Sequence, residues 1–205
     1  SGGRPTGLST PFAGQPVQGF SGIRSLGNGE FLVLTDNGFG AKANSPDEML
    51  FSHRLKADFG KGAVERLSTT FLHDPDRKIP FRIVHEGTQM RYLTGADFDI
   101  ESVQPVADGF WLGDEFGPYL LKFDTKGQLT DVIPTTVDGK PVISPDNALI
   151  QLPGTPVGKN PVFNLKRSGG FEGLAMSKDG SKLYGLLEGA LYQDDGKMET
   201  VDGHT

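Results

Sequence analysis

The stretch Asp99-Ile100-Glu101-Ser102-Val103 is followed by Asp108-Gly109 and then by Gly113-Asp114-Glu115-Phe116-Gly117. The same order of a polar residue, an apolar run, an Asx-Gly pair, a second apolar run and an acid starts again near Gly19 and near Gly170. The polar residue precedes the Asx residue by seven positions in all three repeats. The three pairs are Ser21 and Asn28, Glu101 and Asp108, and Glu172 and Asp179. Recurring hairpins of this kind are typical of β-propellers, in which equivalent positions of successive blades converge on one axis.

Composition agrees with an all-β chain and excludes several function classes. Of the 205 residues, 29 are Gly and 14 are Pro, which favours many short strands and turns. Cysteine is absent, which excludes disulfides, thiolate zinc sites and a cysteine nucleophile. The formal charge of −6 argues against a nucleic-acid partner. No apolar run approaches the roughly 20 residues of a membrane span, and no leader peptide is visible at the first residues.

We interpret the chain, residues 1–205, as the N-terminal part of one propeller domain. The predicted units cover about 19–84, 98–133 and 170–205, with a proline-rich excursion at 134–166. Further strands are expected at Met49–Leu55 (a helix is the alternative there), Val64–Leu72, Ile79–Val84, Leu120–Asp124, Thr130–Ile133 and Ala190–Gln193. Natural propellers have about four to eight blades, so three units would form roughly half of a six- or seven-bladed ring. The expected partner is therefore the C-terminal half, as a second chain or a further segment.

The hairpin turns predict where the acids lie. Two-residue turns at Asn28-Gly29 and Asp108-Gly109 would pair Ser21 with Asp36 and Val103 with Asp114. The third turn would set Glu172 opposite Leu187. Each hairpin then carries acids at its open end, and these ends would meet at one mouth of the channel.

Carboxylates that crowd together repel one another unless a cation lies among them or some are protonated. Calcium fits best, since it takes six to eight oxygen ligands at roughly 2.3–2.6 Å, whereas the sequence has no HExxH-type zinc motif. The predicted metal ligands are Glu101, Asp114, Glu172, Glu188 and Asp99.

Three sequence motifs together resemble those of the phytase-like propeller family, which is labelled "esterase-like activity of phytase". They are Asp97-Phe98-Asp99-Ile100-Glu101-Ser102, Gly113-Asp114-Glu115-Phe116-Gly117-Pro118-Tyr119 and Gly169-Gly170-Phe171-Glu172-Gly173-Leu174-Ala175. The similarity spans about residues 19–193. It implies hydrolysis of phosphoric or carboxylic esters, a periplasmic or secreted location, and a full length about twice that of this chain. The aspartate-rich motifs of the alkaline propeller phytases are missing, so the resemblance does not imply phytate as the substrate.

The sequence therefore predicts a calcium-dependent hydrolase of phosphoric esters that acts on a small-molecule substrate. Calcium would neutralise the phosphate and acidify a water molecule, and Glu115 or Asp36 would accept the proton. Arg24 and Arg167 are the candidate phosphate contacts. Two alternatives stay open: a calcium-dependent carboxylesterase or lactonase, and a non-catalytic binding platform with structural calcium.

Overall fold

The computed structural model describes residues 19–150 and 162–193. Across these residues the chain is all-β, as predicted, apart from the short 3-10 helix η1 (Lys42–Asn44), which the sequence did not indicate. Two antiparallel sheets keep their four strands in sequence order. The strands of the first sheet are β1 (Phe20–Gly27), β2 (Glu30–Thr35), β3 (Phe51–Asp58) and β4 (Ala63–Phe71). Those of the second are β5 (Ile100–Val106), β6 (Gly109–Asp114), β7 (Tyr119–Asp124) and β8 (Leu129–Pro134).

Two smaller hairpins complete the strands. They are β9 (Thr136–Val137) with β10 (Lys140–Pro141), and β11 (Phe171–Met176) with β12 (Leu183–Leu187). The predicted strand after Pro46 is confirmed as β3, so the helical alternative there is wrong. The predicted strands that correspond to β4, β7 and β8 are also confirmed.

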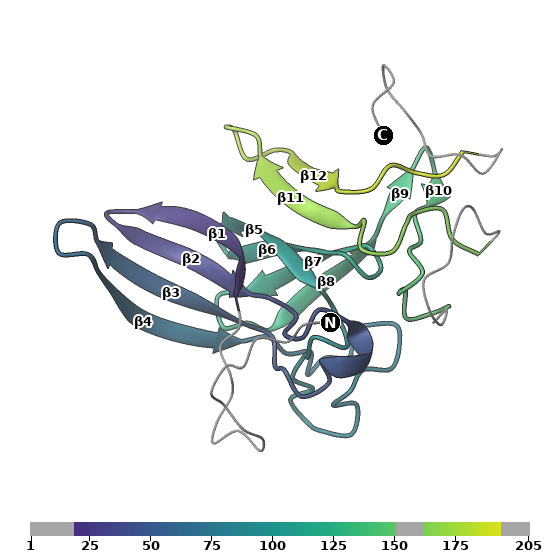
Figure 1. The fold of residues 1–205 in the computed structure, drawn as a ribbon, viewed down its shortest axis with the longest axis horizontal. Coiled ribbons are helices and arrows are strands. Elements are labelled where there is room, and N and C mark those ends of the chain that lie inside the picture. Colours follow the sequence, from purple (N-terminus) through teal and green to yellow (C-terminus); the bar gives the residue numbers. More distant parts are fainter. Residues whose placement is uncertain (1–18, 151–161, 194–205) are drawn as a thin grey trace, which may run out of the picture.

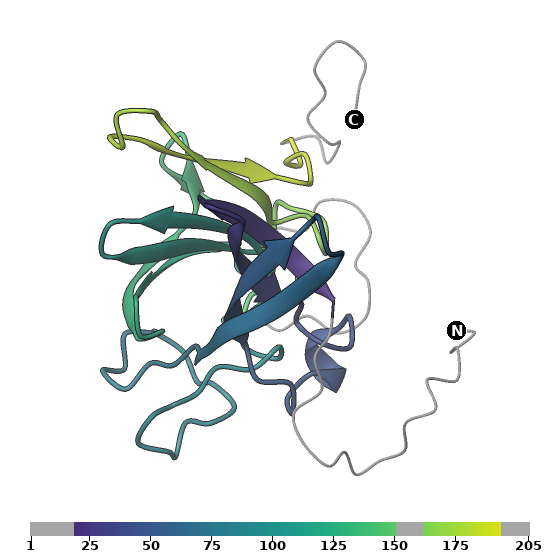
Figure 2. The ribbon, with the colours of Figure 1, turned by 90° about the vertical axis from the view of Figure 1, so that its left-hand side faces the viewer.

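The first strands of the three hairpins lie together. β5 packs beside both β1 and β11. Figures 1 and 2 show the β5–β8 sheet next to the β1–β4 sheet, with the β11–β12 hairpin on the other side of β5. Arg24 of β1 joins all three strands, because its guanidinium donates to Val103 O of β5 (2.9 Å) and to Leu174 O of β11. The described residues do not close a ring, so the propeller remains a prediction.

The long segment between β4 and β5 contributes to the core without forming the strand predicted at Ile79–Val84. Its backbone N–H groups donate to carboxylates instead of to a neighbouring strand: Ile79 N to Asp74 (3.1 Å) and Val84 N to Asp97 (2.8 Å). Pro80 removes one further donor from this stretch. The side chains of Ile79 and Ile83 are nevertheless buried in the main core.

The strand predicted at Ala190–Gln193 is also wrong where the structure describes it. Leu191 forms one isolated antiparallel bridge with Leu165 and does not extend the β11–β12 sheet. The remainder of this predicted unit, residues 194–205, lies outside the described residues, as does 151–161 of the proline-rich excursion. The described part of that excursion packs on the β6–β7 connection, where Asn147 Nδ2 donates to Gly117 O (2.9 Å).

Candidate metal centre

Each of the three hairpins carries a β-bulge at the same position. The strand pairing skips the residue between Phe20 and Gly22, between Ile100 and Ser102, and between Phe171 and Gly173. The skipped residues are Ser21, Glu101 and Glu172. A bulge inserts one unpaired residue and re-aims its side chain, and bulges are frequent beside functional sites.

The bulges overturn the predicted pairings at the open ends. Ser21 does not pair with Asp36, since Phe20 pairs with Thr35 across the shift. Glu172 does not oppose Leu187, because the bulge brings Phe171 to that place. In the second hairpin the turn also forms one residue earlier than predicted, with Val106 paired to Gly109.

For the same reason Val103 pairs with Leu112, and the predicted partner Asp114 lies opposite Ile100.

Beyond each bulge, one backbone hydrogen bond closes the end of the hairpin. Asp36 N donates to Gly19 O (2.9 Å), Glu115 N to Asp99 O (2.8 Å) and Glu188 N to Gly170 O (2.8 Å). Asp36, Glu115 and Glu188 are therefore equivalent residues. Asp99 occupies the position that is glycine in the other two hairpins, so the second hairpin gains one extra carboxylate.

These positions bring six carboxylates into two groups. The first trio is Asp36, Asp99 and Glu101; the second trio is Glu115, Glu172 and Glu188. Within each trio, one oxygen of every carboxylate lies within 4.8 Å of the others. Each trio draws its members from two neighbouring hairpins. Each trio joins the acid that follows the second strand of one hairpin, Asp36 or Glu115, to the bulge acid of the next hairpin, Glu101 or Glu172.

The first trio is built around a buried aspartate. Asp99 is 6% exposed, and its Oδ1 has no hydrogen-bond partner. Burial raises the pKa of Asp99 to about 9, and repulsion from Glu101 and Glu115 adds to the rise. Burial also raises the pKa of Glu101, while hydrogen bonds with Asp99 and with Ser21, the bulge residue of the first hairpin, oppose this.

The charges of the second trio and of the first trio repel one another. Burial raises the pKa of Glu115 to about 8, with further repulsion from Glu101 of the first trio and from Glu172 and Glu188. Glu172 and Glu188 are exposed. The pKa of Glu172 is raised by its partial burial and by Glu188, and Lys166 opposes that rise.

Asp114, one of the predicted metal ligands, lies outside both trios. Its fully buried carboxylate accepts hydrogen bonds from Asp99 N (2.9 Å), Phe116 N (3.2 Å) and Gly117 N (2.8 Å). Burial raises its pKa to about 6 in spite of these bonds. Asp114 thus fixes the backbone that presents Asp99 and Glu115.

The two arginines predicted to contact phosphate are engaged elsewhere. Arg24 donates to the backbone carbonyls that join the three inner strands, and Arg167 forms an ion pair with Asp146. Lys166, which was not among the predicted phosphate contacts, lies nearer the acids, with its Nζ 3.4 Å from Glu188 Oε2. Its position depends on the packing of the third hairpin, so sequence spacing alone gave no signal for it.

Calcium fits the donor set of the first trio. All its donors are oxygens, and two ligands of one calcium ion lie at most about 5 Å apart, twice the length of a calcium–oxygen bond. The observed limit of 4.8 Å satisfies this condition. A buried carboxylate oxygen without a donor is costly, and coordination of a cation would remove that cost.

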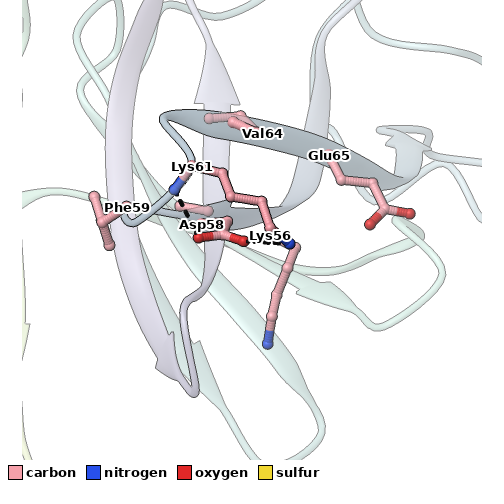
Figure 3. Close-up of a pocket in the computed structure, with 8 residues that line it drawn as sticks. Lys56, Asp58, Phe59, Lys61, Val64 and Glu65 are labelled. Atoms are coloured by element: carbon pink, nitrogen blue, oxygen red, sulfur yellow. Dashed lines mark hydrogen bonds and ion pairs between the residues drawn. The ribbon is translucent and has the colours of Figure 1, made fainter.

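A surface pocket lies far from these acids along the first sheet. Figure 3 shows it at the β3–β4 turn, lined by Lys56, Asp58, Phe59, Lys61, Val64 and Glu65, with Ala57 and Ala63. Three of its charged groups already have partners: Lys61 pairs with Asp58 (3.2 Å), and Lys56 donates to Asn28 O. We assign no chemistry to this pocket.

The fold and the site together define an all-β protein with a cluster of oxygen ligands suited to a hard cation. Comparison with known proteins gives the family. The chain matches the phytase-like family, described as "esterase-like activity of phytase", over residues 15–203, and it belongs to that family.

One relative is an uncharacterized secreted protein of Arthroderma benhamiae, which is 35% identical over 106 residues. The aligned stretch covers 48% of this chain and 21% of the relative, so the chain matches about a fifth of the relative's length. No solved structure matches the chain significantly. No helix among the described residues is long and apolar enough to cross a membrane.

Proposed function

We propose that this chain is part of a calcium-dependent hydrolase of phosphoric esters, with calcium held by the first trio. The observation that carries the proposal is the buried Asp99 carboxylate, whose Oδ1 lacks a hydrogen-bond donor while two further carboxylates lie within reach of the same ion. Membership of the phytase-like family supports the reaction class.

The residues of the two trios would have different roles. Asp36, Asp99 and Glu101 would hold calcium, which when bound would supply positive charge against the negative charge that develops on the phosphate. Glu115 is the better candidate for proton acceptor. Acids of both trios, Glu101 and Glu172, repel its charge, and its raised pKa of about 8 lies near neutrality. Asp36, the other candidate, already belongs to the first trio.

A calcium-dependent carboxylesterase or lactonase is the second candidate. It is favoured by the engagement of Arg24 and Arg167 within the fold, which leaves fewer cations to bind a phosphate dianion. The third candidate, a binding platform with structural calcium, is favoured by the origin of each trio in two hairpins, since an ion there would tie the hairpins together.

We further propose that additional blades complete a propeller around these strands. The support is the β11–β12 hairpin: the described residues give its sheet two strands, against four in each of the preceding sheets, and its Tyr184 (57%) and Leu186 (68%) are exposed. The missing blades would come from a second chain or from a further segment of the same protein. Secretion, or export to the periplasm, is proposed from the relative described as secreted.

Calorimetric titration with calcium and turnover assays would test the function. We expect calcium binding, and hydrolysis of p-nitrophenyl phosphate that stops when calcium is chelated. Glu101→Gln should abolish both properties, whereas Asp108→Asn, at an exposed turn carboxylate paired with Lys122, should retain them. Hydrolysis of p-nitrophenyl acetate alone would favour the esterase, and calcium binding without turnover would favour the platform. Absence of calcium binding would exclude all three.

A further inference from the structure

Lys166 is held in a defined position at the rim of the second trio. The preceding residue, Leu165, is completely buried and bridges Leu191, and Asn164 is fixed on both sides by Ile143 N (2.8 Å) and Tyr192 N (2.8 Å). The backbone that carries Lys166 is therefore anchored to two other segments.

The stem of Lys166 lies over two glycines. A Cβ on Gly169 would meet Lys166 Cγ at 2.8 Å, and a Cβ on Gly189 would meet Lys166 Cγ and Cε at 3.0 Å. These glycines are themselves joined, because Gly189 N donates to Gly169 O (2.9 Å). A side chain at 169 would displace the Lys166 stem and one at 189 would crowd it, so the two glycines leave room for the stem to reach towards Glu188.

The ammonium group has capacity for another ligand. Within residues 19–150 and 162–193 it forms one ion pair, with Glu188 at 3.4 Å, and both side chains are partly exposed, 39% for Lys166 and 45% for Glu188. A lysine carries three N–H donors, so at least two remain for an acceptor that enters from solvent. The other basic side chains near the site, Arg24, Lys42 and Arg167, already contact backbone carbonyls or Asp146.

We infer that Lys166, at the rim of the second trio, binds the anionic group of a substrate whose reacting end lies at the calcium of the first trio. This inference rests on the proposed function, and it makes Lys166 the residue that selects phosphorylated esters over neutral ones. A cation is needed at this place because the six carboxylates would otherwise repel a phosphate dianion. Lysine is a common phosphate ligand, and it acts as a point charge without the fixed geometry of arginine.

Equilibrium binding of inorganic phosphate to the calcium-loaded protein tests this without requiring turnover. Lys166→Met should weaken phosphate binding about 10-fold to 100-fold, the factor expected for the loss of one charge-assisted hydrogen bond. Lys166→Arg should restore most of the affinity, and Lys182→Met, at an exposed lysine in the β11–β12 turn, should match the unmodified protein. Calcium affinity should be unchanged or higher in Lys166→Met.

Steady-state kinetics give a second readout. Lys166→Met should raise KM for p-nitrophenyl phosphate and leave the kinetics of p-nitrophenyl acetate unchanged. Equal phosphate affinity in Lys166→Met and the unmodified protein would overturn the inference while the calcium site stands, and so would a calcium-loaded protein that binds no phosphate. A protein that binds no calcium would reject the proposed function itself. If Lys166→Met does not fold, Lys166→Gln takes its place.

Discussion

The two trios occupy equivalent places in neighbouring hairpins but differ in their surroundings. In the first trio, Asp99 is buried with an unpartnered oxygen, and no ion pair with a basic residue forms there within the described ranges. In the second trio, Glu172 and Glu188 are exposed and Lys166 supplies a positive charge. The repeat thus sets where the carboxylates lie, and the residues that differ between repeats set the surroundings of each trio. In our proposals, Asp99, where the other hairpins have glycine, gives the first trio its calcium site, and Lys166 gives the second trio an anion contact.

Removal of calcium should expose this difference as a dependence of stability on pH. Folding raises the pKa of Asp99 to about 9, because burial and the neighbouring Glu101, Glu115 and Asp114 disfavour its charge, and raises that of Glu115 to about 8. A group whose pKa is higher in the folded state contributes its full stabilisation below its unfolded pKa, about 4, and loses it as the pH rises through the folded value. The calcium-free protein should lose stability from about pH 4 to pH 8 or 9, by up to about 1.4 kcal/mol per pH unit for each such group.

Urea denaturation between pH 5 and 9, with chelator and with excess calcium, would measure this slope. Calcium should flatten it, since coordinated carboxylates stay ionised throughout the range. Asp99→Asn should reduce the slope more than Glu188→Gln does, because Asp99 is buried. A flat profile in the absence of calcium would contradict the electrostatic account of the first trio.

The second comparison is calcium affinity. Asp99→Asn should weaken calcium binding about 100-fold, because it removes a charged oxygen ligand at the most buried point of the first trio. Glu188→Gln should weaken it by less than about 10-fold, because Glu188 is an exposed member of the second trio and already pairs with Lys166. Calorimetry on both variants checks the order, and equal losses would show that the two trios act as one site.

The smallest effect concerns the glycines that are equivalent to Asp99. A Cβ on Gly170 would lie 2.4 Å from Glu115 Cα, whereas one on Gly19 would meet no atom within 4 Å. Gly170→Ala should therefore displace β11 from Glu115 and destabilise the protein by about 1–3 kcal/mol. Gly19→Ala should change stability by less than about 0.5 kcal/mol. Similar unfolding free energies for the two variants would refute the close approach at the second trio.

Much of the strand order could be predicted, since each hairpin has its own turn signal and alternating apolar residues. The prediction of strands was wrong where backbone N–H groups donate to side chains and not to a neighbouring strand. At Ile79–Val84 the apolar run is strand-like, but buried carboxylates of Asp74 and Asp97 take its N–H groups. A short apolar run does not by itself show which acceptor its backbone will meet.

The sequence named the acidic residues that the structure brings together, but it did not give their grouping. Asp36, Asp99, Glu101, Glu115, Glu172 and Glu188 were all named from the sequence and lie in the two trios. Asp114 was named as well, yet three backbone amides occupy its carboxylate. Adjacent acids in one strand cannot be told apart from sequence, because one residue of register decides which of them faces the site.

The sequence by itself determined the recurrence of a hairpin with an acid after its second strand, because turn chemistry and alternation act over a few neighbouring residues. The tertiary structure decided which acids share a trio, and that Arg24 and Arg167 are engaged within the fold while Lys166 remains at the rim. The bulges at Ser21, Glu101 and Glu172 are the physical reason. Each adds one residue to a strand and redirects its side chain, and the partners that it meets come from another hairpin, whose position depends on how the sheets pack.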